Sequence, residues 1–415
     1  MSKTMRLNEK TTTTFIPTLS ILIKRITAVV AFVCVIIVYT FAKDQRIVVT
    51  IMNSLQLDRS NEIIVLQWDE LKKLSPTLDP ATICILDVKT NNELITQVID
   101  RDQNGIPEEL IFRSDFRGKE TKQFIVQAYD RGSKTIQSLT EVHFMLPRED
   151  IAWENDRNAY RIYGPILAKD VNNGIDVWAK RVRSLIIEKW YKGDEATGSN
   201  RISYHEDHGE GADFFDVGRT LGAGSCALFR DDSLYQPGVF ATYKILATGP
   251  LRTMFEVTYK PVQFVGKNIS EVKRITLDAG SNLNSVEVTY TCDSLKGTVP
   301  FAVGIVKRKG VTIYTEKENR WVSLWGQTNE KEENGSFGTG IVMTKRTFKD
   351  FKEDKTHVLI LGIAELGKAA NYYTGAAWTR SGDFNTVEEW NNYLKEFSQR
   401  LESPCTITLA IEKNN

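Results

Sequence analysis

The sequence predicts an all-β fold, with a small N-terminal β-sandwich followed by a large antiparallel supersandwich and one C-terminal helix. Segments rich in β-branched residues recur along the chain and are separated by turn-forming residues, which is typical of short strands. Helical periodicity is scarce before residue 385. A chain of 415 residues also exceeds the usual size of one small domain, so two β units of unequal size are expected.

An apolar run over residues 26–42 is the first feature of the chain. Lys24 and Arg25 precede the run and Lys43 follows it, which is the layout of a signal peptide or a signal anchor. At about 17 residues the run is near the lower limit for crossing a bilayer. We therefore predict an exported protein, periplasmic or on the cell surface. Residues 1–42 are either cleaved or retained as an anchor, and only this segment meets the membrane.

The remaining chain divides into two strand-rich stretches. Residues 43–147 carry short alternating segments with short connections, at 46–51, 81–86 and 123–128, which predict the small sandwich. Residues 148–415 carry longer strands, so they predict the supersandwich, in which the candidate site lies. Its strands are expected at residues 255–259, 271–277, 285–291, 301–306, 357–361 and 406–411.

One helix is expected near the C-terminus. Asn385 has a side chain that is suited to capping a helix. Large apolar residues then recur at helical spacing on one face, and we interpret this stripe as core packing against a sheet. The stripe consists of Trp390, Tyr393, Leu394, Phe397 and Leu401.

One polar segment of the small sandwich resembles the first half of a calcium loop. Asp100, Asp102 and Asn104 place side-chain oxygens at alternate positions before a glycine, and calcium prefers such ligands. Ile111 stands where a bidentate glutamate would close the loop, so Glu108 or its neighbour would have to replace it. Calcium or another divalent cation is one interpretation, and a hairpin turn with acidic residues is the other. The chemistry expected of this protein requires no cofactor.

A polar cluster in the middle of the chain is the main candidate for chemistry. It contains two of the four histidines, three positions apart, with acids between and after them. Imidazole exchanges protons near neutral pH, and carboxylates orient it, raise its pKa or share a metal with it. The cluster consists of Tyr204, His205, Asp207, His208, Glu210 and Asp213.

The cluster predicts specific roles. We expect His205 or His208 to act as the acid or base, and Asp207 and Glu210 to orient or tune it, with Tyr204 beside them. If the segment is extended, His205 and Asp207 share one side of it. The neighbouring glycines would let a ligand approach the backbone. A metal site at the same histidines and a solvated surface loop are the alternatives.

Aromatic and cationic residues gather in three further segments. In a single strand, Trp153, Arg157 and Arg161 share one face, which suits stacking on a sugar ring and binding of a carboxylate or sulfate. The mixture recurs twice, so we expect a groove for an acidic oligosaccharide or polysaccharide. A salt-bridged strand and packing at the rim of the sandwich are the alternatives. The substrate-binding candidates are Trp153, Arg157, Arg161, Asp176, Trp178, Lys180, Tyr373, Trp378 and Arg380.

Four strings resemble the bacterial domain-of-unknown-function family 4861: WENDRNAYRIYGP at 153–165, GIDVW at 174–178, YHEDHGEGAD at 204–213 and LDAGSNLN at 277–284. The likeness extends from about residue 46 to the C-terminus. It implies a secreted or periplasmic protein of a Bacteroidetes-type polysaccharide utilisation locus that processes plant or algal glycans, often beside pectin- or uronate-degrading enzymes. The last string and the long strands also resemble the galactose-mutarotase-like supersandwich, which implies a fold and no epimerase role.

Charge and resemblance together frame the expected function. The chain has 53 basic and 53 acidic residues, so its overall field gives no attraction for nucleic acid. We favour a carbohydrate-active lyase or hydrolase that acts on acidic, uronate-containing, pectin-like oligosaccharides, in which an arginine or a cation neutralises the uronate. The alternatives are a non-catalytic glycan-binding protein and an epimerase of a free sugar.

Overall fold

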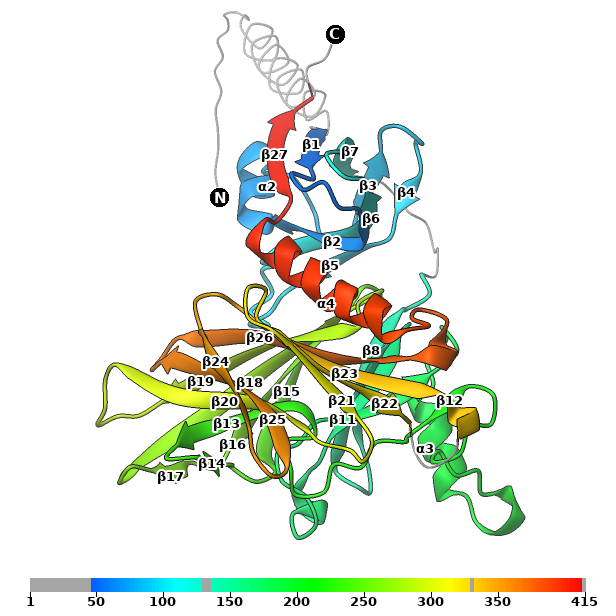
Figure 1. Ribbon diagram of the computed structural model, residues 1–415. Helices are drawn as coiled ribbons and strands as arrows, with labels where there is room; N and C mark the ends of the chain where they lie inside the picture. Colours follow the sequence, from blue (N-terminus) through cyan, green and yellow to red (C-terminus); the bar gives the residue numbers. More distant parts are fainter. Residues whose placement is uncertain (1–45, 129–135, 329–331, 413–415) are drawn as a thin grey trace, which may run out of the picture. The chain divides into compact units, whose positions relative to one another are not determined.

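The computed structural model describes residues 46–128, 136–328 and 332–412, and these residues form antiparallel sheets with a few helices (Figure 1). The all-β prediction is confirmed. The predicted signal or anchor segment at 26–42 lies outside the described residues. Within the described part, no helix has the length and apolar character needed to span a membrane.

The small sandwich consists of a five-stranded and a three-stranded sheet. Its core lies between them, where Phe112 of one sheet meets Phe124 of the other at 4.8 Å between ring centroids. The five-stranded sheet has the order β27-β1-β7-β3-β4, with β27 at Thr406–Ile411, β1 at Ile47–Met52, β7 at Thr121–Ala128, β3 at Ile83–Asp87 and β4 at Glu93–Leu94. The other has the order β2-β6-β5, with β2 at Arg59–Gln67, β6 at Glu109–Phe116 and β5 at Thr96–Ile99.

Two strands lie across the predicted boundary between the stretches. We expected residues 406–411 in the supersandwich, and this is wrong, because β27 pairs antiparallel with β1 over its whole length. Alternation of residue types reveals which face of a strand is buried but not which strand is its neighbour. The reverse holds for β8, at Thr140–Met145: it lies within the stretch predicted as the small sandwich, but it pairs with β9 of the larger part.

The larger part contains three sheets. One has the order β12-β11-β10-β9-β8, with β12 at Gly211–Ala212, β11 at Asp176–Lys180, β10 at Asn158–Ile162 and β9 at Asp150–Asn155. The second has the order β14-β13-β20-β25-β24, with β14 at Ser233–Tyr235, β13 at Ala223–Arg230, β20 at Thr298–Val306, β25 at His357–Glu365 and β24 at Phe348–Glu353.

The third is a nine-stranded sheet with the order β15-β16-β18-β19-β26-β23-β22-β21, and β17 pairs with β18 beside this path. Its strands are β15 at Phe240–Ala247, β16 at Arg252–Tyr259, β17 at Val262–Phe264, β18 at Lys267–Asp278, β19 at Leu283–Thr291, β21 at Thr312–Glu316, β22 at Trp321–Gln327, β23 at Ser336–Met343 and β26 at Ala369–Trp378.

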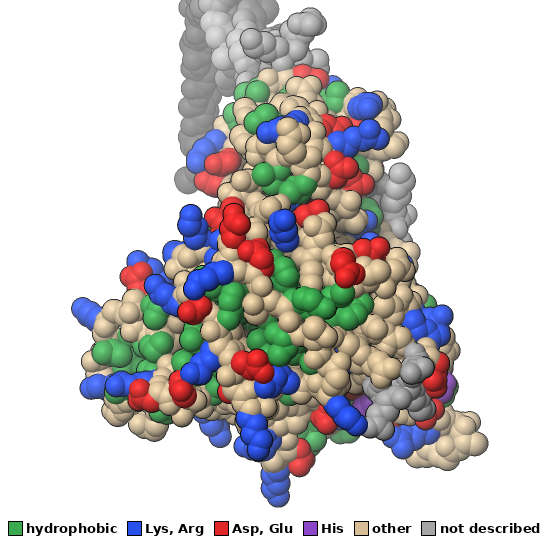
Figure 2. All heavy atoms as spheres, viewed as in Figure 1, with side chains coloured by type: hydrophobic (Ala, Val, Ile, Leu, Met, Phe, Trp, Pro, Cys, Tyr) green, Lys and Arg blue, Asp and Glu red, His purple; other side chains and the backbone are tan. Residues whose placement is uncertain are grey.

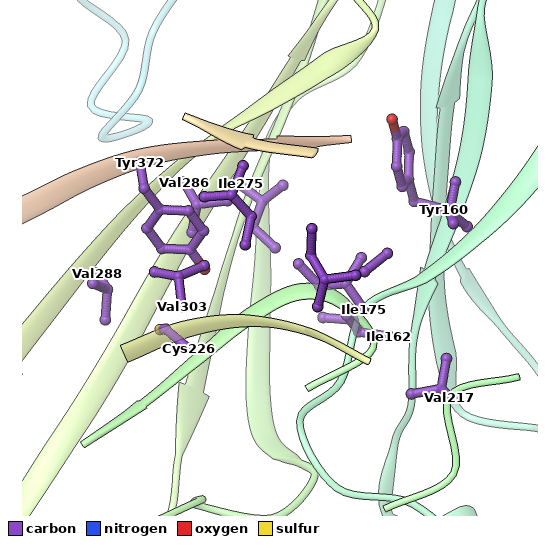
Figure 3. Packing of buried hydrophobic residues seen from close by; sticks show 14 of the residues in the cluster. Tyr160, Ile162, Ile175, Val217, Cys226, Ile275, Val286, Val288, Val303 and Tyr372 are labelled. Carbon is purple, nitrogen blue, oxygen red and sulfur yellow. The ribbon is translucent and has the colours of Figure 1, made fainter. Parts of the chain in front are cut away.

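One large apolar core joins these three sheets. Figure 3 shows Tyr160 and Ile162 of β10 together with Cys226 of β13, Val286 of β19 and Tyr372 of β26, which the chain brings together from distant positions. Burial alternates along β18 from Ile269 onward. Ile269, Ile275 and Leu277 enter this core, and Glu271 and Lys273 form a buried ion pair on the same side. The alternating pattern predicted the strand for this reason.

The C-terminal helix is confirmed as α4, Val387–Glu402. Trp390 and Leu394 are buried against the nine-stranded sheet, where Figure 1 shows α4 crossing it. Thr386, not Asn385, caps the helix: its hydroxyl accepts a hydrogen bond from the backbone of Glu389, whose carboxylate accepts in return from the backbone of Asn385 at 2.6 Å.

Two shorter α-helices were not predicted, because each is too brief to establish a helical repeat. They are α2 at Trp68–Leu74 and α3 at Ile187–Glu195. Single 3-10 turns lie at Pro165–Leu167, Gly198–Asn200, Glu332–Asn334 and Thr379–Ser381. On the face drawn in Figure 2, basic and acidic side chains are interspersed, as the balanced charge of the chain leads one to expect.

Candidate functional site

The predicted aromatic and arginine face is divided between the two sides of a β-hairpin. β9 and β10 are joined by a turn at residues 156–157, so our expectation of one strand through this segment is wrong. Trp153 pairs with Tyr160 and lies in the main core, fully buried, where its Nε1 donates to Asn284 Oδ1 at 2.7 Å. Trp153 therefore has no surface on which a sugar could stack.

Arg161 lies on the opposite side of the same hairpin from Trp153. It pairs across the strands with Asp176 of β11, and Trp178 follows on the same side. This side is covered by α3 and by the loop around Tyr204, and the Trp178 ring stacks 4.9 Å from the Tyr204 ring. The structure therefore brings the predicted residues of β10 and β11 together, but buries them.

Arg161 is the centre of a buried polar cluster. Its guanidinium donates to Asp176 Oδ2 at 2.7 Å and 3.0 Å, to Asp213 Oδ2 at 3.2 Å and to the Tyr204 hydroxyl at 3.0 Å. Asp150 Oδ2 lies 3.9 Å from Nη1, and the Tyr163 hydroxyl accepts at 3.4 Å. We call these residues the Arg161 cluster: Asp150, Arg161, Tyr163, Asp176, Tyr204 and Asp213.

Three carboxylates around one guanidinium do not all ionise easily. Burial and the nearby charge of Asp176 raise the pKa of Asp213 well above its usual range, although Arg161 opposes this. Burial raises the pKa of Asp150 to about 6. Burial, followed by the charge of Asp176, raises the pKa of the Tyr163 hydroxyl. Burial therefore favours the protonated forms of Asp213 and Asp150.

His205 connects this cluster to solvent. Its Nδ1 lies 3.5 Å from Asp213 Oδ2 and 3.3 Å from the Asp213 carbonyl oxygen. The Asp213 side chain is 2% exposed and that of His205 is 57% exposed. A buried acid and an exposed base thus stand side by side, which is an arrangement that can transfer a proton between the interior and a bound ligand.

A cavity of about 530 Å³ opens at this pair, and we call it the His205 cavity. Arg161, His205 and Asp213 contribute its polar wall, and Tyr163, Phe214 and Phe215 contribute aromatic surface. Asp170 and Asp216 also line it. The volume lies in the range typical of small-molecule sites.

His208 does not share this cavity. It faces a separate cavity of about 350 Å³ that is also lined by Trp190, Tyr204 and Glu210. Residues 204–210 form turns and bends, so the condition of an extended segment, under which His205 and Asp207 would share one side, is not met. Gly211 has a φ of +120° and approaches Ala179 so closely that a Cβ atom would lie 1.9 Å from its carbonyl oxygen. This glycine serves packing against β11 rather than close approach of a ligand.

Asp207 and Glu210 hold the loop in place instead of contacting an imidazole. Asp207 accepts hydrogen bonds from the backbones of Gly209 and Gly211, at 2.8 Å and 3.0 Å, and its carboxylate lies 3.0 Å from Arg181 and 3.2 Å from Arg380. Glu210 accepts from Lys189 at 2.7 Å and from Trp190 at 3.3 Å. The expectation that these two acids tune a histidine therefore finds no contact to support it.

The other predicted sugar-binding residues lie elsewhere. Arg157 pairs with Asp383 at 2.5 Å, and Arg380 pairs with Asp207. Trp378 is fully buried, with its Nε1 donating to the Asn334 carbonyl at 2.7 Å. Tyr373 lines a third cavity, beside α4. The structure does not bring these four together into one groove.

Lys180 is also buried, beside Glu154. Its Nζ donates to the Glu154 carboxylate and, at 2.7 Å, to the Asn155 carbonyl. The other carboxylate oxygen of Glu154 accepts from the backbones of Ile186 and Ile187 at 2.6 Å and 2.7 Å, at the first turn of α3. The pair therefore attaches α3 to the sheet, and Lys180 is not available to a substrate.

The predicted calcium segment forms a compact turn. Asp100, Asp102 and Glu108 each offer an oxygen within 4.8 Å of the others, so Glu108 takes the position that the sequence left open. Both Asp100 oxygens accept backbone hydrogen bonds, from Asn104 at 3.1 Å and from Gly105 at 2.7 Å, and the Asn104 side chain bonds within the turn. These bonds already stabilise the turn, so calcium binding stays a prediction.

If calcium binds this turn, removing it with a chelator is expected to lower the melting temperature by a few degrees, because a ligand that binds only the folded state stabilises it. The measurement is a thermal melt with calcium and with chelator. Asp100→Asn serves as the matched variant, which should melt alike in both. Equal melting of the wild-type chain in both solutions would eliminate calcium from this segment.

Two residues of the Arg161 cluster were not predicted as site residues. They are Asp150 and Tyr163, whose contacts depend on the pairing of β9, β10 and β11. Asp213 was predicted as a member of the polar cluster around His205, although no role was assigned to it.

The comparisons with known proteins give a family but no activity. The chain is 30% identical over 377 residues to Uncharacterized protein P7 of Formosa agariphila. The matched region covers 87% of this chain and 93% of that protein. Two solved structures from Enterococcus faecalis cover about nine-tenths of this chain. They are a protein in glycosyl hydrolase family 38, at 9% identity and TM-score 0.48, and an alpha-mannosidase, at 8% identity and TM-score 0.40.

The chain spans about half the length of those two structures, namely 48% and 46%, and at these scores neither likeness supports an inference. The model of the family named Domain of unknown function (DUF4861) matches residues 51–407. This match confirms the resemblance seen in the sequence. The chain belongs to the DUF4861 family.

Proposed function

We propose that this chain is an exported carbohydrate-active enzyme, a lyase or hydrolase, whose reaction takes place in the His205 cavity. One observation carries the proposal: the buried acid Asp213 stands 3.5 Å from the exposed imidazole of His205 at the wall of that cavity. Export rests on the apolar run at residues 26–42, and cell fractionation tests it.

The pair suits reactions that move a proton at a glycosidic bond. Hydrolysis requires an acid that protonates the leaving oxygen, and an acid with a raised pKa is suited to this role. Elimination requires a base that removes a proton next to a carboxylate. Burial raises the pKa of Asp213, which favours its protonated form, and the exposed ring of His205 can accept a proton. Arg161 orients Asp213 through its 3.2 Å contact.

The proposal that the substrate is acidic rests on other grounds than the Asp213–His205 pair. Arg157 and Arg161, which we expected to bind a uronate, are both paired with carboxylates of the protein. In the His205 cavity, His205 is the group left to face a uronate, while Asp170 and Asp216 would repel one. The proposal of an acidic oligosaccharide therefore rests on the family resemblance, and neutral oligosaccharides belong in its test.

The two alternative functions have less support. A binding protein with a shallow aromatic strip needs exposed rings, and among the large apolar side chains that are exposed in the described part of the chain, Tyr243 is the one aromatic. An epimerase needs a histidine and a carboxylate on opposite faces of a sugar, whereas His205 and Asp213 are in contact on one side of the cavity.

A substrate panel tests the proposal. The full chain is incubated with pectic and other uronate oligosaccharides and with neutral ones, while the absorbance of a new double bond and the release of reducing ends are followed. A new double bond identifies a lyase, and reducing ends alone identify a hydrolase. We expect turnover of at least one uronate oligosaccharide. Turnover of neutral substrates alone would contradict the proposal that the substrate is acidic. If no substrate is turned over, the proposal that the chain is an enzyme is contradicted.

A further inference from the structure

We propose that a second cavity, beside α4, binds an anionic sugar residue and that Arg400 binds its carboxylate or sulfate. This cavity has a volume of about 280 Å³, and we call it the Arg400 cavity. It lies between β2, α4 and strands β18, β19 and β26. Tyr372 faces the main core, so the adjacent Tyr373 lines this cavity from the opposite side of the sheet.

Arg400 is unusual among the arginines of the described residues. Its side chain is only 16% exposed, yet its guanidinium donates no hydrogen bond to any of them, and its Nε is buried without a partner. The nearest carboxylate oxygen is Glu62 Oε2, at 3.9 Å from Nη1. Removing such a group from water without providing acceptors is unfavourable, so a ligand that supplies two oxygens recovers this free energy.

The acids at the cavity are already engaged by other arginines. Glu62 Oε1 lies 2.6 Å from Arg59 Nη1. Both oxygens of Asp278 accept from Arg252, at 2.6 Å and 2.9 Å. Each carboxylate thus has a closer cation than Arg400, and these closer arginines offset its repulsion of an anionic ligand.

The other side chains around the guanidinium favour a sugar over a simple anion. Arg400 lies 5.8 Å from the Tyr393 ring centroid and 5.5 Å from that of Phe397, and Tyr373 packs edge-on against Phe397 at 4.9 Å. The guanidinium lies over the faces of Tyr393 and Phe397, so these two rings hold it in place at the cavity. Ser60, Asn61 and Tyr373 line the same cavity with hydroxyl and amide groups that suit the hydroxyls of a sugar. Hydrogen-bonding groups beside a guanidinium that donates no hydrogen bond to the described residues match a uronate or a sulfated sugar.

This inference goes beyond the proposed function and rests on it only for the class of ligand. The Arg400 cavity and the His205 cavity have no lining residue in common. Binding here therefore requires no turnover, and turnover requires no binding here. The cavity would hold part of a longer chain or a separate acidic glycan.

The test measures binding of three probes to the full chain: glucuronic acid, glucose 6-sulfate and glucose. We expect the two acidic probes to bind at least tenfold more tightly than glucose. Arg400→Gln is expected to reduce their affinity to that of glucose. Arg274→Gln is the matched control. Arg274 lies on the same face of β18 as Thr276 and Asp278, which line the cavity, but it pairs with Glu256 and Glu287 outside the cavity. It should bind like the wild type.

The outcomes separate the two proposals and the two ligand sources. Binding of glucuronic acid alone assigns the site to a carboxylate, and binding of the sulfate alone assigns it to a sulfated sugar. Equal affinity for glucose, no acidic binding at all, or acidic binding that survives in Arg400→Gln would overturn the inference. Loss of binding in Asp213→Asn alone would place the probe in the His205 cavity. If Arg400→Gln melts early, Arg400→Lys is used, which retains the charge but loses the fork and should bind more weakly.

Discussion

Replacing Asp213 by asparagine is expected to lower turnover of the substrate found in the panel by about 10²–10⁴-fold. Asparagine keeps the shape of the side chain but has no carboxylic proton to deliver. The pKa of Asp213 is raised, so the wild-type rate should fall as the pH rises through that pKa, when the acid loses its proton. This alkaline limb should be absent from the residual activity of the variant. The measurement is kcat/KM against pH.

Two histidine variants make this test specific. His205→Ala is expected to lose activity to a similar degree, because it removes the group that faces both Asp213 and the cavity. His208→Ala is the matched control, since His208 faces another cavity, and it should turn over substrate like the wild type. Wild-type rates in both Asp213→Asn and His205→Ala would contradict the catalytic role of these two residues. Loss of turnover in His208→Ala alone would assign the catalytic role to His208 instead.

Replacing Lys180 by methionine is expected to lower the free energy of unfolding by about 3–5 kcal/mol. Lys180 and Glu154 are both fully buried, and the methionine would leave the Glu154 carboxylate without its cation. Burial already raises the pKa of Glu154, so the variant should stabilise the protonated carboxyl further. Chemical denaturation of the wild type and the variant measures the difference.

Two further variants separate the charge from the packing. Lys180→Met combined with Glu154→Gln should recover part of the loss, because the neutral amide needs no cation and its carbonyl oxygen can still accept from the backbones of Ile186 and Ile187. Lys189→Met removes an exposed pair with Glu210, in which Lys189 is 68% exposed, and should change stability by less than about 1 kcal/mol. A loss in Lys180→Met no greater than that in Lys189→Met would contradict the burial argument.

The strands of the large sheets were predictable because their burial alternates. Residues 271–277 and 285–291 lie within β18 and β19, where alternate side chains enter the core. The stripe from Trp390 to Leu401 predicted α4 for the same reason, since burial imposes the helical period. The turn at residues 156–157 was missed although its turn-forming residues are visible in the sequence: Asn155 Oδ1 accepts from the backbones of Arg157 and Asn158 at 2.8 Å and 3.0 Å. Missing this turn placed Trp153 and Arg161 on the same face.

The candidate site was predictable only in part. The sequence singled out His205, Arg161 and Asp176, and the structure brings all three into or beside the Arg161 cluster. Whether a charged residue is buried and paired depends on long-range packing, so Lys180, Trp178 and Arg157 looked like surface groups from sequence alone. Arg400 was passed over for the opposite reason, because an arginine in the last turn of a helix is usually solvated.

The pairing of β27 with β1 has a consequence for the order of folding. β27 comes some 350 residues after β1, and the backbone of Glu412 donates to the carbonyl of Arg46 at 2.8 Å. During synthesis, β1 thus remains unpaired on one side until almost the whole chain has emerged. Its Val- and Ile-rich edge could meanwhile capture strands of other molecules, so a truncation that removes β27 would promote aggregation.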